Sequence, residues 1–225
     1  MKLFYFLILL LISQNFFAQE KYIFDYLIEY EKTENITDSI VTSTEYYLTN
    51  SKNNAYTAIV STKDKDSFDI NFKHQNGIRL KATVDKNQFS IAESINIKCS
   101  QYDKYDNPFR NKIKLYDFHN LEDTLINGKL SKRYSFKSNR KKRTKRLKLG
   151  TLNFNIQENT EFHLPILRFS TSYEEWKDKA YIPNGIFKTR SFTNYSGKVE
   201  TLEKLVHYKK NDLIIYITED CDDIK

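Results

Sequence analysis

Residues 67–85, SFDINFKHQNGIRLKATVD, contain the pattern that decides the fold. Apolar and polar side chains alternate with a period of two on both sides of Gln75-Asn76-Gly77. Such alternation is typical of strands with one buried and one solvated face, and Asn-Gly supplies the positive φ angles of a tight hairpin turn. The segment therefore predicts two neighbouring antiparallel strands. Their apolar positions are Phe68, Ile70 and Phe72 before the turn, and Ile78, Leu80, Ala82 and Val84 after it.

The same alternation recurs elsewhere in the chain. The first strand is expected to place on one face Tyr22, Phe24, Tyr26, Ile28 and Tyr30. Further turns are predicted at Asn127-Gly128, Asn184-Gly185, Ser196-Gly197 and the polar stretch 209–212. The composition agrees, because 16 Tyr and 16 Phe accompany only 5 Gly and 3 Pro, and aromatic residues favour a pleated surface. We expect a mainly β domain, a curved antiparallel sheet or half-barrel of about ten strands.

One segment has a helical pattern instead. In residues 170–181, STSYEEWKDKAY, capping boxes are possible from Thr171 to Glu174 or from Ser172 to Glu175. A helix over residues 172–180 would place Trp176 near an aromatic neighbour, Tyr173, on one side. We therefore expect one or two short helices beside the sheet.

The N-terminus resembles a targeting segment. In MKLFYFLILLLISQNFFAQE, one basic residue precedes ten unbroken apolar residues, 3–12, and a polar break leads to Ala18. This is the layout of a secretory signal peptide, whereas a membrane span needs about 20 apolar residues. We expect a signal peptide at residues 1–18 and a single mature domain at residues 19–225 without a transmembrane segment. The protein is then exported and either periplasmic or secreted.

The chain has only two cysteines, Cys99 and Cys221. In an oxidising compartment an even number of cysteines favours a disulfide. The pair is therefore a disulfide candidate, and two separate thiols are the alternative.

A dense basic run occupies residues 138–150, SNRKKRTKRLKLG, and is expected to be a loop between two strands. The formal net charge of the chain is +7, and without the basic residues of this region the chain is close to neutral. No aromatic residue is interleaved for base stacking, which together with export argues against a nucleic-acid partner. An anionic membrane surface or lipopolysaccharide is one interpretation, and a solvated loop without a partner is the other. The surface-binding candidates are Arg140, Lys141, Lys142, Arg143, Lys145, Arg146 and Lys148.

Motifs for catalysis or metal binding are absent from the sequence. The four histidines lie far apart, without HExxH or zinc-finger spacing, and His163 in EFHLPIL is expected at a core or edge position. No GxSxG elbow, P-loop or GxGxxG occurs. The acidic stretches at residues 64–69 and in the tail, 219–225, lack the layout of a calcium loop and are interpreted as solvated charge. We therefore assign no catalytic residue, no metal ligand and no cofactor.

The C-terminal third carries a family resemblance. Ile182-Pro183-Asn184-Gly185-Ile186, a strand, Ser196-Gly197-Lys198, a strand, the polar stretch 209–212 and a last strand follow one another over about 45 residues. This order resembles the closing meander of periplasmic lipoprotein-carrier-like domains, and it is similar to small uncharacterised exported β-rich proteins of Gram-negative bacteria. The resemblance implies an incomplete antiparallel barrel whose helices cover a cavity for acyl chains. The chain departs from the pattern in having fewer helices to cover such a cavity.

These observations favour an exported, non-catalytic binding protein of the cell envelope, with a lipid or another amphipathic molecule as its ligand. The alternative is a module that binds a protein or a surface through residues 140–148. An enzyme, such as a hydrolase that uses carboxylates from separate strands, is left open because side chains that meet only in space leave no sequence motif.

Overall fold

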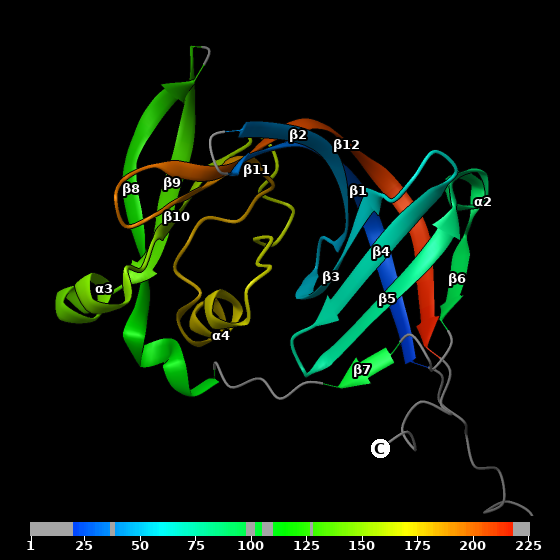
Figure 1. The fold of residues 1–225 in the computed structure, drawn as a ribbon, viewed down its shortest axis with the longest axis horizontal. Coiled ribbons are helices and arrows are strands. Elements are labelled where there is room, and N and C mark those ends of the chain that lie inside the picture. The colour runs from blue at the N-terminus through cyan, green and yellow to red at the C-terminus, as the bar shows by residue number, and fades with distance from the viewer. Residues whose placement is uncertain (1–19, 37–38, 98–101, 105–109, 127, 218–225) are drawn as a thin grey trace, which may run out of the picture.

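A computed structural model describes residues 20–36, 39–97, 102–104, 110–126 and 128–217. The chain forms one long sheet with short helices at both ends (Figure 1). The strands are β1 (Glu20–Ile36), β2 (Ser39–Asn50), β3 (Asn53–Thr62), β4 (Ser67–His74), β5 (Ile78–Asp85), β6 (Ser94–Ile97), β7 (Tyr102–Lys104), β8 (Tyr116–Ile126), β9 (Lys129–Ser138), β10 (Thr151–Ile156), β11 (Phe187–Thr193) and β12 (Val199–Ile217). The helices are α2 (Lys86–Ile91), the 3₁₀ turn η2 (Arg110–Leu115), α3 (Lys141–Leu147) and α4 (Ser170–Lys179).

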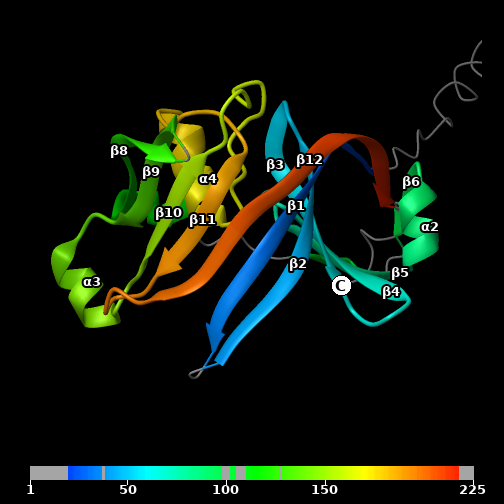
Figure 2. The ribbon, with the colours of Figure 1, turned by 90° about the horizontal axis from the view of Figure 1, so that it is seen from above.

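The sheet is antiparallel and open. Its order is β7-β5-β4-β3-β2-β1-β12-β11-β10-β9-β8, and β6 pairs in parallel with the end of β12. Figures 1 and 2 show that β1, β2 and β12 run from one half of the molecule to the other. The expected mainly β, curved antiparallel architecture is confirmed, with twelve described strands where about ten were predicted.

Local turn chemistry explains the hairpins. The predicted β4–β5 turn is present, and Gly77 adopts a φ of 111° that residues with a side chain rarely reach. The β8–β9 turn contains Gly128 at φ 78°, and the β11–β12 turn contains Gly197 at φ 88°.

Within the described residues, no helix is both long and apolar enough to cross a membrane.

The turn predicted at residues 209–212 is wrong. β12 continues through this stretch, because it pairs with β1 on both sides of it. Phe24 pairs with Leu213 and Tyr26 pairs with Lys210, so two residues of β12 lie opposite one residue of β1. The polar stretch is therefore a β-bulge, and its Asn211 amide donates to the Phe24 carbonyl over 3.2 Å.

Two apolar cores lie under the two halves of the sheet. The first is formed mainly by β3, β4 and β5 with the ends of β1 and β12. The second lies among β8 to β11, the middle of β1, and residues 166–186. The aromatic row predicted on the first strand is shared between them, since Phe24 packs in the first core whereas Ile28 and Tyr30 pack in the second. The strand that crosses the molecule thus connects both cores.

The predicted helix is present as α4, and Tyr173 and Trp176 pack against the second core. Neither expected capping box forms, because the helix begins earlier, with Phe169 at the N-cap and no side-chain cap. Ser172 instead lies inside the first turn and donates to the Phe169 carbonyl over 2.7 Å.

A substitution of Phe24 tests whether the first core stabilises the fold. Its side chain is fully buried and meets Tyr56 edge to face, with ring centroids 5.5 Å apart. We expect Phe24→Ala to lower the free energy of unfolding by about 3–5 kcal/mol, because it removes a buried ring and leaves a cavity. The measurement is urea unfolding followed by circular dichroism. Ile23→Ala on the exposed face of the same strand is the control, and equal losses in both variants would contradict the assignment.

Candidate functional site

The connection between β10 and α4, residues 157–169, is fixed against β2 and β3 by hydrogen bonds. The Leu164 amide donates to the Ser51 carbonyl over 2.9 Å, and the Asn54 side-chain amide donates to the Pro165 carbonyl over 3.0 Å. The apolar side chains of Ile166 and Leu167 are buried in the second core. These contacts fix the next two residues, 168 and 169, over the middle of the sheet.

His163 helps to hold this connection in place. Its Nδ1–H donates to the Leu164 carbonyl over 2.5 Å, since a carbonyl can only accept. Its Nε2 therefore accepts from the Thr49 hydroxyl over 2.8 Å. Burial lowers the pKa of the imidazole, although the carbonyl bond acts in the opposite direction. The prediction of a core position is confirmed, with 1% of the residue exposed.

A buried ionic network is formed by side chains of β2, β11 and β12, which come together although β1 lies between β2 and β12 in the sheet. Arg190 on β11 and Glu203 on β12 are cross-strand partners, 5% and 1% exposed. Arg190 Nη2 donates to Glu203 Oε1 over 2.6 Å, and Arg190 Nε pairs with Oε2. The Tyr47 hydroxyl donates to the same Oε1 over 2.7 Å and accepts from Arg190 over 2.9 Å. The three residues form a compact charge-assisted cluster.

Arg168 extends the network to the surface. Its Nη1 donates to the Tyr47 hydroxyl over 2.6 Å and to Glu203 Oε1 over 3.2 Å. It also lies 3.6 Å from Glu45 Oε2, and Glu45 in turn pairs with Lys32 over 3.0 Å. Lys32 pairs with Glu34 over 3.1 Å. The network therefore runs from a fully buried pair to partly exposed cations.

The charges of the network set the ionisation of its members. Burial alone would raise the pKa of Glu203, but Arg190 and Arg168 outweigh it and lower the pKa below the ordinary glutamate value. Burial raises the pKa of the Tyr47 hydroxyl, so that it stays protonated and can donate. Glu203 is thus an ionised hydrogen-bond acceptor and is poorly suited to proton donation.

A charged pocket of about 340 Å³ opens beside this network. Cations and carboxylates line it together with apolar and aromatic side chains. The lining residues are Lys32, Glu34, Leu152, Arg168, Phe169, Arg190, Phe192, Thr201 and Glu203.

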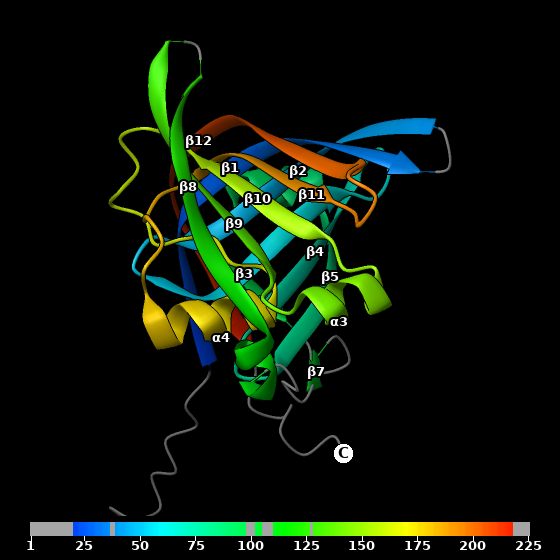
Figure 3. The same ribbon diagram turned by 90° about the vertical axis from the view of Figure 1, so that its left-hand side faces the viewer.

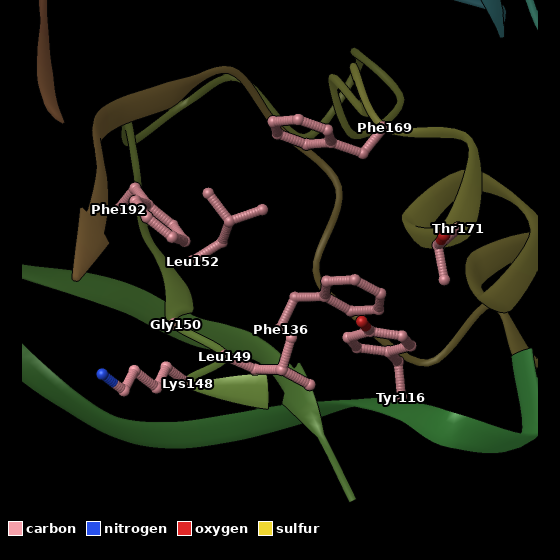
Figure 4. A pocket seen from close by; sticks show the side chains of 9 residues that line it. All are labelled: Tyr116, Phe136, Lys148, Leu149, Gly150, Leu152, Phe169, Thr171 and Phe192. Carbon is pink, nitrogen blue, oxygen red and sulfur yellow. The ribbon is translucent and has the colours of Figure 1, made fainter. Parts of the chain in front are cut away.

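An apolar pocket of about 330 Å³ adjoins the charged pocket. The two pockets have three lining residues in common, Leu152, Phe169 and Phe192. Figure 4 shows the rings of the apolar pocket grouped around one space, while the Lys148 ammonium points away from them. The lining residues are Tyr116, Phe136, Lys148, Leu149, Gly150, Leu152, Phe169, Thr171 and Phe192.

Packing shapes the walls of the apolar pocket. Tyr116 and Phe136 stack with ring centroids 5.5 Å apart and planes 15° apart. A Cβ atom at Gly150 would lie 2.5 Å from the Phe192 ring, so only glycine allows β10 and this ring to approach so closely. Phe169 is 50% exposed although it borders both pockets.

The basic run lies at the end of the molecule formed by β8, β9 and β10 (Figures 1 and 3), and its Lys148 lines the apolar pocket. It connects β9 with β10, but residues 141–147 form α3 where a loop was expected. None of its residues is Gly or Pro, which permits a helix, and the helix ends where Lys148 adopts a left-handed φ of 47°. The Arg143 guanidinium lies over the Tyr116 ring, 4.8 Å from its centroid. Only the end of the run, Lys148, Leu149 and Gly150, lines the apolar pocket.

Other candidates from the sequence are not brought together. Cys99 and Cys221, and the acidic tail, lie outside the described residues. In the stretch 64–69, Asp64 accepts from the Ser67 amide and hydroxyl over 2.8 and 2.6 Å, so it stabilises a turn. In the part of the chain that the structure describes, no group of three or more His, Cys, Asp or Glu side chains is placed to hold a metal ion.

Among the described residues, carboxylates from separate elements share a cation in the buried network and at Lys179. Glu45 and Glu203 both contact Arg168 in the network above. Asp117 and Glu175 both contact the Lys179 ammonium, over 3.0 and 2.6 Å. The second pair lines neither pocket. Both pairs are bound by cations in the manner of structural ion pairs.

The sequence did not reveal the network or the pockets. Glu45, Arg168, Arg190 and Glu203 come from four distant segments and share no motif. The ion pair between Arg190 and Glu203 could have been predicted in part. The turn predicted at Ser196-Gly197 places these opposite charges on neighbouring strands.

Comparisons with known proteins concern the fold. Neither a family model nor a curated protein matches the sequence. The MucA/MucB complex of Pseudomonas aeruginosa has a TM-score of 0.42 at 7% identity, covering 83% of this chain and 52% of that chain. The chain thus spans about half the length of that relative. An uncharacterized conserved protein from Thermus thermophilus has a TM-score of 0.40 at 9% identity, covering 93% of this chain and 88% of that chain.

A structure described as an outer membrane lipoprotein-sorting protein domain, from Vibrio parahaemolyticus, has a TM-score of 0.34 at 10% identity, covering 83% of this chain and 85% of that chain. The description of this structure names the kind of domain that the sequence resembles, although the turn at residues 209–212 on which that resemblance partly rested is a bulge. The likeness concerns the fold, and no residue role is transferred with it.

Glu203 tests the buried network. We expect Glu203→Gln to lower the free energy of unfolding by about 3–5 kcal/mol, because Arg190 would remain buried without its counter-charge. Glu31→Gln on the exposed surface of β1 is the control. Replacing both partners, as Arg190→Met with Glu203→Leu, should recover most of the loss in urea unfolding. A double variant no more stable than Glu203→Gln would contradict this account.

The lowered pKa of His163 predicts that the stability of the folded protein depends on pH. The imidazole has a lowered pKa in the folded protein, whereas the unfolded chain titrates near 6.5. Below about pH 6.5 the unfolded state takes up protons that the folded state excludes, so stability falls on acidification. We expect the loss of unfolding free energy between pH 7.5 and pH 5.5 to be smaller in His163→Gln than in the wild type. An unchanged difference would show that His163 is not the titrating group.

Proposed function

We propose that the chain is an exported, non-catalytic binding protein of the cell envelope that holds an amphipathic ligand. The apolar part of the ligand occupies the apolar pocket, and its polar part lies in the charged pocket. The observation that carries this proposal is the shared wall of Leu152, Phe169 and Phe192, which puts an apolar and a charged compartment side by side.

The size and chemistry of the two compartments support this assignment. Each has a volume of about 330–340 Å³, within the range of small-molecule sites. The apolar pocket offers rings and aliphatic side chains, which favour a hydrocarbon chain over a polar molecule. The charged pocket offers both signs of charge, so it suits a head group that can accept hydrogen bonds from Arg168 and donate them to Glu34.

Export is the second part of the proposal and is supported by the signal-peptide pattern of residues 1–18. In the oxidising compartment that export implies, Cys99 and Cys221 would form a disulfide. Non-reducing mass spectrometry of peptides from the exported protein tests the pairing.

Filling the apolar pocket tests the ligand assignment. Thr171 lines the pocket at the start of α4, so Thr171→Trp places a large ring inside it. Asp178→Trp introduces the same ring at an exposed position of α4 and is the control. With dodecanoate as the probe in calorimetry, we expect Thr171→Trp to weaken binding at least tenfold and the control to leave it unchanged.

Two results would overturn the proposal. One is equal dodecanoate binding by wild type and Thr171→Trp when both have the same melting temperature. The other is a protein that, purified without detergent, carries no lipid in native mass spectrometry and whose melting temperature no lipid shifts.

A further inference from the structure

The basic helix α3 and its flanking residues form a surface that carries seven cations and no carboxylate within residues 140–148. We propose that this surface docks the protein on a phospholipid membrane that contains anionic lipids. The residues of this basic surface are Arg140, Lys141, Lys142, Arg143, Lys145, Arg146 and Lys148.

The cations of the basic surface are mostly exposed to solvent and are not neutralised by carboxylates. All of its cations except Arg143 are exposed, and Arg143 is half-buried over Tyr116. Among the described residues, none of the seven pairs with a carboxylate, whereas Lys32, Lys179 and Arg190 elsewhere in the chain all do. A concentration of unpaired cations attracts an extended anionic surface.

The distribution of these cations favours a membrane over a specific macromolecular partner. They occupy all sides of a two-turn helix, so they do not converge on one point as a site for a single carboxylate or phosphate would require. Residues 140–148 contain no aromatic residue for base stacking. Leu147, 49% exposed among the cations, offers an apolar side chain to the interfacial region of a bilayer.

The position of the basic surface determines which side of the protein would face the membrane. Lys148 belongs both to the basic surface and to the rim of the apolar pocket, and Leu149 and Gly150 follow it in the wall. Arg143 contacts Tyr116, which lines the same pocket. A protein docked through α3 therefore holds the rim of the apolar pocket close to the lipid surface. The consequence for lipid uptake rests on the proposed function, whereas the docking itself does not.

Vesicle sedimentation tests the docking. The probes are vesicles of phosphatidylcholine with phosphatidylglycerol as the anionic component, and vesicles of phosphatidylcholine alone. The test variant is Lys141→Gln/Lys142→Gln/Lys145→Gln. The matched control, Lys21→Gln/Lys65→Gln/Lys81→Gln, removes the same charge from exposed positions in β1, in the connection between β3 and β4, and in β5.

We expect the wild type and the control to bind the anionic vesicles and to bind neutral vesicles weakly. Each cation near an anionic surface contributes roughly fivefold to partitioning, so the α3 variant should bind about a hundredfold more weakly. Raising the salt to about 0.5 M should release the wild type, because exposed charges are then screened. Dodecanoate binding measured in solution should be unchanged in the α3 variant, which separates docking from pocket binding.

Three outcomes would overturn the docking. They are equal vesicle binding by the α3 variant and the wild type, equal losses in the α3 variant and the control, and wild-type protein that binds neither kind of vesicle. The last would favour an acidic protein partner for the basic surface. Loss of dodecanoate binding in Thr171→Trp with intact vesicle binding would support both proposals.

Discussion

The buried ion pair between Arg190 and Glu203 is the interaction on which the rest of the structure depends. A guanidinium in an apolar core is tolerated only with a counter-charge and further hydrogen-bond partners, and here Glu203 and Tyr47 supply them. The pair joins β11 to β12, and Tyr47 joins both to β2. Tyr47 belongs to the second core, so satisfying this buried charge fixes β2, β11 and β12 relative to one another there.

The need to pair the buried charges also shapes the candidate site. Arg168 completes the network from outside the sheet, and the next residue, Phe169, separates the charged pocket from the apolar pocket. An ionic network at the base of one pocket and stacked rings in the other keep a polar and an apolar environment apart within a short distance. The stabilising interactions and the proposed ligand contacts are therefore made in part by the same side chains.

The sequence could predict the elements better than their assembly. Alternation identified β4, β5 and the start of β1, and the Asn-Gly turns located two hairpins, because both signals are local. The turn predicted at residues 209–212 was wrong, because a polar stretch has the same composition in a turn and in a bulge. Only the pairing of β12 with β1 distinguishes the bulge from a turn. The basic run was recognised, but its helix and its place beside Tyr116 depend on tertiary contacts. The network was not predicted because five segments of the chain contribute one or two side chains each.

The pairing of β1 with β12 has a consequence for the order in which the chain folds. The partner of Glu20 is Ile217, so the centre of the sheet joins segments separated by almost the whole described sequence. Contacts of such long range slow folding, because the entropy of closing the loop is lost before the contacts form. Until β12 has been synthesised, Phe24, Ile28 and Tyr30 lack one of the two strands that flank them. A nascent chain of this topology therefore cannot complete the centre of its sheet until β12 has been made.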